Sequence, residues 1–387
     1  MAVDAARGVA LLGMIAVHVL KTSDNAALST WSYAFFGGRA SAAFAMLTGV
    51  AIAFMTGRRQ VPRSAGRTTA ATLGARALFI GALGLALGYT DPQLGAVILP
   101  YYAMMFALAI PLVFLPTRAL VTTGLTMAAT TPTLVHLLPP DLSGPSHENL
   151  SFGHLRDPVA LLTELSITGF YPALPWLAYL CAGLVIGRLD LSRPRVGAAL
   201  LGVGIAVTVA ASAVSSLLLD HAGLARIQAA QPDSELTRAE TMELLKFGGK
   251  GTTPTSTWWW LAVDAPHTST PFNLLSATGT AMALLGVMLL AGGGKSALRR
   301  IVVAVQTPLA AAGGMTLTLY TAHIVFINSG YDVFPADASY LLQAVAALLV
   351  GTIWRAAGVR GPLEAAAAAL ARQARRWASG AEGRSRR

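Results

Sequence analysis

The feature that most constrains this sequence is a series of apolar segments, each close to the length that crosses a lipid bilayer. A spanning helix needs about 20 mostly apolar residues. Charged residues make up only 12% of the chain and hydrophobic residues 54%, whereas soluble domains carry about 25% charged residues. The sequence therefore predicts an all-α, polytopic membrane protein with about ten transmembrane helices. The predicted spans are residues 4–20, 35–55, 70–88, 97–115, 119–137, 168–187, 197–219, 271–291, 307–327 and 339–356.

The positive residues between these segments predict how the chain is oriented. Cytoplasmic loops of membrane proteins carry an excess of lysine and arginine. Arginines gather in every second loop, as in Arg58, Arg59, Arg63 and Arg67 after the second span, and the opposite short loops hold few. Both termini should therefore be cytoplasmic. The alanine, glycine and arginine content is typical of bacteria with GC-rich genomes, which favours the bacterial inner (plasma) membrane as the location.

The chain divides into a transmembrane domain, residues 1–360, and a basic tail, residues 361–387. The tail is rich in alanine and arginine, and we expect a cytoplasmic amphipathic helix that lies along the inner membrane surface. Two long loops, 138–167 and 220–270, should be extracytoplasmic. The second contains the run Trp258-Trp259-Trp260, which is compatible either with interfacial anchors or with a stacking platform for a sugar-like molecule.

The first span carries three ionisable residues, Asp4, Arg7 and His18. Arg7 and His18 are eleven positions apart, which on a helix places them within roughly 20° of one face and about 16 Å apart along the axis. Asp4 and Arg7, at i and i+3, share a side as well. Ionisable groups in spanning helices usually face a protein interior or a wet cavity and indicate function. We therefore expect this helix to line a functional site.

Several other polar residues fall at the depth of His18, in the outer third of the predicted membrane domain. They are Arg39, Tyr101, Tyr102, His267 and His323. Together they predict a polar chamber open to the outside. Each also has a structural interpretation: a histidine at a helix end can simply be a hydrogen-bonded interfacial residue, and Arg39 can extend to the lipid headgroups.

Other kinds of site are not supported. The chain has one cysteine, Cys181, so an internal disulfide is excluded. There is no closely spaced set of cysteines and histidines, so we expect no metal, and Gly292-Gly293-Gly294 lacks the lysine that a phosphate-binding loop needs. The net charge of +10 is explained by the loop arginines, so we expect no nucleic-acid partner.

Five short motifs resemble a known family when they are taken in order. Asp4-x-x-Arg7-Gly8, followed by His18 after ten residues, resembles the R-x10-H pattern of membrane acyltransferases. The other four are the segments 36–41 (Phe-Gly-Gly-Arg-Ala-Ser), 174–179 (Leu-Pro-Trp-Leu-Ala-Tyr), 265–267 (Ala-Pro-His) and 317–323 (Leu-Thr-Leu-Tyr-Thr-Ala-His). Nearly the whole chain is similar to the heparan-α-glucosaminide N-acetyltransferase-like bacterial branch of the transmembrane acyltransferase superfamily.

This resemblance implies an enzyme that moves an acyl group, often acetyl, from cytoplasmic acyl-CoA to a hydroxyl or amine outside the membrane. The acceptor would be a glycan, a lipid or a small molecule of the cell envelope, and membrane lipids surround the protein. His18 would be the general base. His267 is the second candidate, with Asp264 orienting it.

The remaining roles follow from the two sides of the membrane. Arg39, Tyr102 and His323 would contact the acceptor or the developing oxyanion. The residues implied for donor binding are Asp4, Arg7, Arg58, Arg59 and Arg76. Arginines pair well with phosphate groups, although the orientation of the chain explains the loop arginines equally well, and Arg76 can simply extend to the inner headgroups.

Two other functions fit the same sequence. A transporter or lipid exporter would use the polar chamber for passage without acyl transfer, and would be indifferent to CoA. A relative without turnover would serve as an interaction partner. The acceptor, the length of the acyl chain, direct transfer as against an acyl-histidine intermediate, and the oligomeric state, a homodimer included, stay open.

Overall fold

The structure is a computed structural model, and it describes residues 1–24, 28–138, 148–234, 236–292 and 297–385. This part of the chain is helical and contains no strand beyond an isolated bridge between Ser23 and Ser29. The all-α prediction is therefore confirmed. The helices are α1 (Ala2–Val19), α2 (Trp31–Phe36), α3 (Arg39–Met55), α4 (Gly66–Leu87), α5 (Leu99–Leu112), α6 (Thr117–His136), α7 (Pro158–Thr163), α8 (Ala173–Gly187), α9 (Pro194–Leu218), α10 (Leu224–Ala229), α11 (Arg238–Phe247), α12 (Pro271–Ala291), α13 (Ala297–Gly313), α14 (Thr316–Ile327), α15 (Ala336–Ala356) and α16 (Pro362–Ser385).

Within the described ranges, six helices are long and apolar enough to cross a membrane, or up to eight if each of two bent pairs is one span. The chain is thus a multi-pass membrane protein. The prediction of ten spans is not confirmed. Helix α5 has only 14 residues, and α6 falls outside the set of apolar spans.

Two predicted spans are wrong as continuous helices. The segment predicted at 307–327 bends by 72° between α13 and α14, at Gly314 and Met315. The segment predicted at 168–187 belongs to a pair bent by 54°, and α8 begins only after Pro172, whose ring cannot continue a preceding helix. An apolar run in the sequence indicates burial or lipid contact, but it does not indicate where the helix is interrupted.

Glycines let the helix backbones approach closely, as is common where spanning helices pack. A Cβ atom at Gly183 on α8 would lie 1.9 Å from the carbonyl oxygen of Met46 on α3. A Cβ atom at Gly313 on α13 would lie 1.7 Å from the carbonyl oxygen of Asp4 on α1. No larger residue fits at either crossing. The second crossing fixes α1 against α13 directly beside Asp4 and Arg7.

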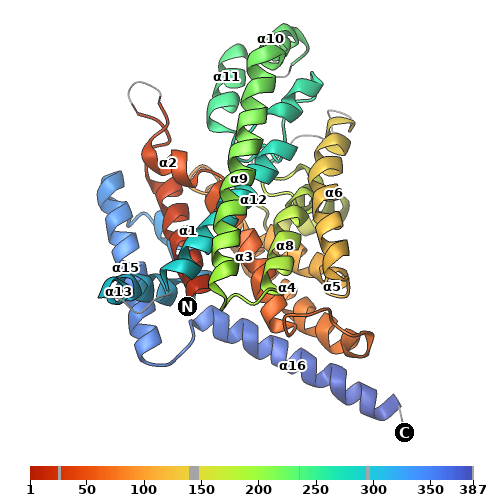
Figure 1. The fold of residues 1–387 in the computed structure, drawn as a ribbon, viewed down its shortest axis with the longest axis vertical. Coiled ribbons are helices and arrows are strands. Elements are labelled where there is room, and N and C mark those ends of the chain that lie inside the picture. The colour runs from red at the N-terminus through yellow and green to blue at the C-terminus, as the bar shows by residue number, and fades with distance from the viewer. Residues whose placement is uncertain (25–27, 139–147, 235, 293–296, 386–387) are drawn as a thin grey trace.

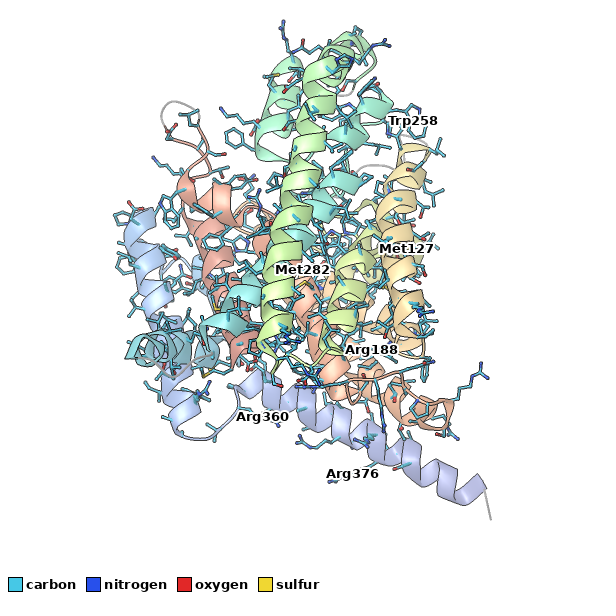
Figure 2. The ribbon with its side chains drawn as sticks, in the orientation of Figure 1. Met127, Arg188, Trp258, Met282, Arg360 and Arg376 are labelled. Carbon is cyan, nitrogen blue, oxygen red and sulfur yellow. The ribbon has the colours of Figure 1, made fainter. Side chains whose placement is uncertain are left out.

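Both termini lie at the end of the bundle away from α10 and α11, and α16 runs across that end (Figure 1). Arg188, Arg360 and Arg376 lie at this same end, whereas Trp258 lies toward the opposite one (Figure 2). Residues 139–147 of the predicted loop 138–167 are outside the described ranges. The rest of that loop includes α7.

Candidate active site

His18 and His323 form a hydrogen-bonded pair. His18 stands in the last turn of α1 and His323 on α14. Their Nδ1 and Nε2 atoms are 2.9 Å apart, and the two rings are inclined by only 10°. His323 is 4% exposed, whereas His18 is partly exposed. The structure therefore joins two of the histidines that the sequence placed at one depth, and of the two only His18 keeps partial exposure.

A loop between α4 and α5 packs against the His18 ring. A Cβ atom at Gly95 would lie 3.3 Å from Nδ1 of His18. Asn149 holds this loop: its Oδ1 accepts from the backbone N–H of Val97 at 2.8 Å, and its Nδ2 donates to the carbonyls of Gly95 and Thr90, each at 3.2 Å. Asn149 is 6% exposed. Sequence analysis missed it, because a single asparagine in a polar loop gives no signal of its own.

His267 lies close to this pair, within electrostatic range of His18. Its ring packs 5.0 Å from Phe170 and 5.5 Å from Tyr171, measured between ring centres. Its Nδ1 is buried and has no hydrogen-bond partner among the described residues. Burial lowers the pKa of His267 to about 4, so the imidazole is neutral at pH 7. A neutral imidazole can accept a proton or donate a hydrogen bond.

The segment that contains Arg39 touches the His267 loop. Gly38 has a φ of +66°, and a Cβ atom there would lie 3.0 Å from Cβ of Pro266 and 3.3 Å from the backbone nitrogen of His267. Only glycine combines this backbone conformation with so close an approach. The Gly-Gly-Arg motif thus serves to bring the start of α3 against His267.

Arg39 and Tyr102 make other contacts than the predicted oxyanion site requires. The Arg39 guanidinium donates to the carbonyl of Ala34. Tyr102 is buried, and its hydroxyl donates to the carbonyl of Ser41 at 3.0 Å. The hydroxyl proton of Tyr102 is therefore already used to hold α3.

Asp264 does not orient His267 in this structure. Its carboxylate accepts hydrogen bonds from Ser212 on α9 and Ser276 on α12, both at 2.6 Å, and the described residues include no hydrogen bond from it to His267. The expected pairing is therefore corrected: Asp264 joins two helices. Proximity along the chain suggested a pair, but the strained backbone between them, with positive φ at His267, turns the two side chains to different neighbours.

The three tryptophans do not form one platform. Trp260 is 1% exposed and packs with Ile227 and Val263. Trp258 is 52% exposed, and its ring centre lies 4.4 Å from that of His136. A sugar therefore could not stack across all three rings, and of Trp258 and Trp260 only Trp258 suits the anchor interpretation.

At the other end of α1, the expected contact between Asp4 and Arg7 is present. The guanidinium of Arg7 donates to Asp4 at 3.4 Å and to the carbonyl of Leu47 at 3.2 Å. Glu364 of α16 is within electrostatic range of Arg7. Glu364 also accepts from the backbone N–H groups of Leu317 and Thr318, so it caps the start of α14, the helix that carries His323.

The other arginines assigned to the donor are dispersed. Arg58 packs 4.3 Å over the Phe54 ring, and Arg59 is exposed. Arg76 lies within electrostatic range of Arg360 and Arg372, and its Nε is buried without a hydrogen-bond partner in the described part of the chain. No hydrogen bond or ion pair joins these side chains to Arg7 among the residues described. No group of three or more potential metal ligands occurs there either.

Fold and site together define a multi-pass helical membrane protein with a hydrogen-bonded imidazole pair between its first helix and α14. The family model of the heparan-α-glucosaminide N-acetyltransferase catalytic domain matches residues 1–219, more than half of the chain, and the chain belongs to this family. The family indicates a membrane enzyme of the N-acetyltransferase type. The match includes His18 and Arg7, whereas His267 and His323 lie beyond it. No curated protein matches the chain.

Proposed function

We propose that this protein transfers an acyl group, acetyl in the first instance, from cytoplasmic acyl-CoA to a hydroxyl or amine on the outer side of the membrane. The observation that carries the proposal is the 2.9 Å contact between His18 and His323 at one end of α1, with Arg7 at the other end. The family match supplies the class of reaction.

Helix α1 connects the two sides of the proposed reaction. Arg7 and His18 are about 16 Å apart along the helix axis, roughly half the thickness of the hydrocarbon core of a bilayer. Arg7 would hold the anionic donor on the cytoplasmic side, where Asp4 fixes its guanidinium. The acyl end of the donor would extend along α1 toward His18.

His18 acts as the general base in this proposal. The acceptor oxygen or nitrogen attacks the thioester carbonyl carbon while Nε2 of His18 takes the acceptor proton. The new C–O or C–N bond forms, the C–S bond breaks, and CoA leaves as the thiolate and is protonated by solvent. Because Nδ1 of His18 contacts His323, Nε2 is the nitrogen left for the acceptor. General bases of this kind contribute about 10²–10⁴-fold to rate.

The membrane orientation belongs to the same proposal. Both termini and α16 would be cytoplasmic, in a bacterial inner membrane, and the loop that begins α15 would face outward. The placement of Arg188, Arg360 and Arg376 at the end that holds the termini (Figure 2) supports this orientation. A topology reporter fused after Arg387 that proved extracytoplasmic would contradict it.

The decisive experiment measures acyl transfer with purified protein in detergent. Radiolabelled acetyl-CoA is the donor and glucosamine, an amino sugar, the acceptor probe. His18→Ala should abolish transfer but leave CoA-dependent thermal stabilisation intact, since ligand binding to the folded state raises its apparent stability. The matched control is His221→Ala, an exposed histidine, which should retain the full rate. Undiminished transfer by His18→Ala would refute the assignment.

The same experiment tests the transporter alternative. A transporter would not be stabilised by CoA, and it would not release CoA from acetyl-CoA. If CoA and acetyl-CoA leave the unfolding temperature unchanged over a wide concentration range, donor binding is excluded and passage through the polar chamber becomes the better interpretation.

A further inference from the structure

The imidazole pair is the start of a longer hydrogen-bonded chain. Nδ1 of His323 lies 2.6 Å from Oε1 of Gln343, Nε2 of Gln343 lies 3.0 Å from Oγ of Ser339, and that oxygen lies 2.8 Å from Oδ2 of Asp332. Gln343 and Ser339 share one face of α15, four residues apart, and are 8% and 1% exposed. Asp332 lies in the loop between α14 and α15.

The acid at the end of this chain sets the direction of every hydrogen bond in it. An ionised carboxylate only accepts, so the Ser339 hydroxyl donates to Asp332. The oxygen of Ser339 then accepts from the amide nitrogen of Gln343, which leaves the amide oxygen to accept from Nδ1–H of His323. A neutral imidazole carries one proton, so Nε2 of His323 is an acceptor and receives the Nδ1–H of His18.

These hydrogen bonds determine the state of Nε2 of His18, the ring nitrogen that takes no part in them. With its proton on Nδ1, His18 presents an unprotonated Nε2. We propose that Asp332, Ser339 and Gln343 are positioning residues, which act through His323 to hold His18 in this tautomer and to stabilise the imidazolium that forms during transfer. This inference rests on the proposed role of His18 as the base.

The chain orients and stabilises, but it does not conduct the proton. Conduction through Gln343 would require its amide oxygen to become protonated, which an amide resists. The carboxylate instead acts electrostatically, since Asp332 lies within range of His323. The titratable groups that face His18 are His323 and His267, so Asp332 is the one anion in the described surroundings that favours a positive charge on the pair.

A purely structural role would not need this arrangement. Polar side chains between spanning helices contribute only about 1 kcal/mol to packing, and a serine and a glutamine could satisfy each other without an acid. Here the second carboxylate oxygen of Asp332, Oδ1, is buried and has no hydrogen-bond partner among the described residues. A partly unsatisfied carboxylate is costly, which is consistent with a function beyond packing.

The first test reads the tautomers directly and needs no acceptor. In protein labelled with ¹⁵N-histidine, seven histidines give signals, and His18→Gln and His323→Gln identify the two of interest by their loss. Both rings should show a protonated Nδ1 and an unprotonated Nε2 at pH 7.5. A protonated Nε2 on His18 would overturn the inference.

The second test measures transfer with variants of the acid. Asp332→Asn should lower kcat about tenfold, the lower end of the range seen when the partner behind a metal-bound histidine is removed. It should leave KM for glucosamine unchanged and move the acidic limb of the pH–kcat profile to lower pH. Asp332→Glu should recover most of the rate. Asp337→Asn, which alters an exposed acid in the first turn of α15, is the control and should match the parent protein.

Ser339 supplies a variant that separates positioning from folding. Ser339→Ala should lower kcat and shift the pH profile, and Ser339→Thr should restore both. If Ser339→Ala and Asp332→Asn change only the unfolding temperature, the chain is structural and the inference fails. Loss of transfer in His18→Ala together with normal Asp332→Asn kinetics would overturn this inference alone, whereas activity in His18→Ala would overturn the proposed function.

Discussion

Replacing Gly95 with alanine perturbs the position of His18 without replacing any titratable group. The new methyl carbon would lie 3.3 Å from Nδ1 and 3.4 Å from Cε1 of His18, and 3.3 Å from Cδ1 of Ile324. Unstrained contacts between such atoms are about 3.5–4.0 Å, so the imidazole must move by about 0.3 Å. The direction of this push is away from the loop, and the bond to His323 is the contact most directly altered.

The size of the effect follows from the cost of misplacing a catalytic group. A displacement of 1 Å can cost about 10²-fold in rate, so about 0.3 Å corresponds to roughly a fourfold loss. Gly95→Val should cost more, because its branched side chain meets the same atoms. The residue at 95 does not require glycine for its backbone, since its φ is not positive, so folding should be retained.

The assay is the initial rate of acetyl transfer to glucosamine, with thermal unfolding measured on the same preparation. Gly74→Ala is the matched control, because nothing lies within 4 Å of its Cβ position. It should keep the parent rate and gain stability, since alanine is favoured over glycine in helices by about 1 kcal/mol. Parent-like rates in Gly95→Ala and Gly95→Val would refute the idea that this loop sets the position of His18.

Three further predictions concern stability, each measured by thermal unfolding in detergent. Asn149→Leu removes the acceptor of the buried N–H of Val97 and the donor to the carbonyls of Gly95 and Thr90, and should cost about 2 kcal/mol or more; an unchanged unfolding temperature would contradict this. Burial lowers the pKa of His267 from about 6.5 in the unfolded chain to about 4. Its contribution to the free energy of unfolding should therefore be complete above pH 6.5 and decrease as the pH drops toward 4. His267→Phe should weaken this pH dependence, and a flat profile in the parent protein would contradict it. Glu364→Gln should cost about 1 kcal/mol by weakening the cap of α14, whereas Glu243→Gln on α11 serves as its control.

Hydropathy and charge predicted the helical membrane fold, and the depth of the polar residues predicted that His18 and His323 belong together. Depth is readable from sequence because polar groups in apolar segments are few. The direction in which each of these side chains points from its helix cannot be predicted from the sequence in the same way. Tyr102 and Arg39 were predicted at the depth of His18, yet their donors are bonded to the backbone carbonyls of Ser41 and Ala34.

The residues behind the imidazole pair could not be found from the sequence. Gln343 and Ser339 stand in an apolar helix without any motif, and their importance depends on which side of α15 meets α14. The position of α14 depends in turn on the 72° bend after α13 and on the carboxylate of Glu364, which is 47 residues from the N–H of Leu317 that it binds. Such contacts arise from tertiary packing and not from local propensity.

The pairing of His18 with His323 joins positions 305 residues apart. This separation determines how late during synthesis the pair can form. The first helix enters the bilayer early, but its histidine has no partner until α14 emerges from the ribosome and α16 closes behind it. A nascent chain, or a fragment that ends at residue 219, therefore has the loop of Gly95 beside His18 but not the hydrogen-bond partner His323. The imidazole pair can therefore form only after residue 323 has been synthesised, when most of the chain is already made.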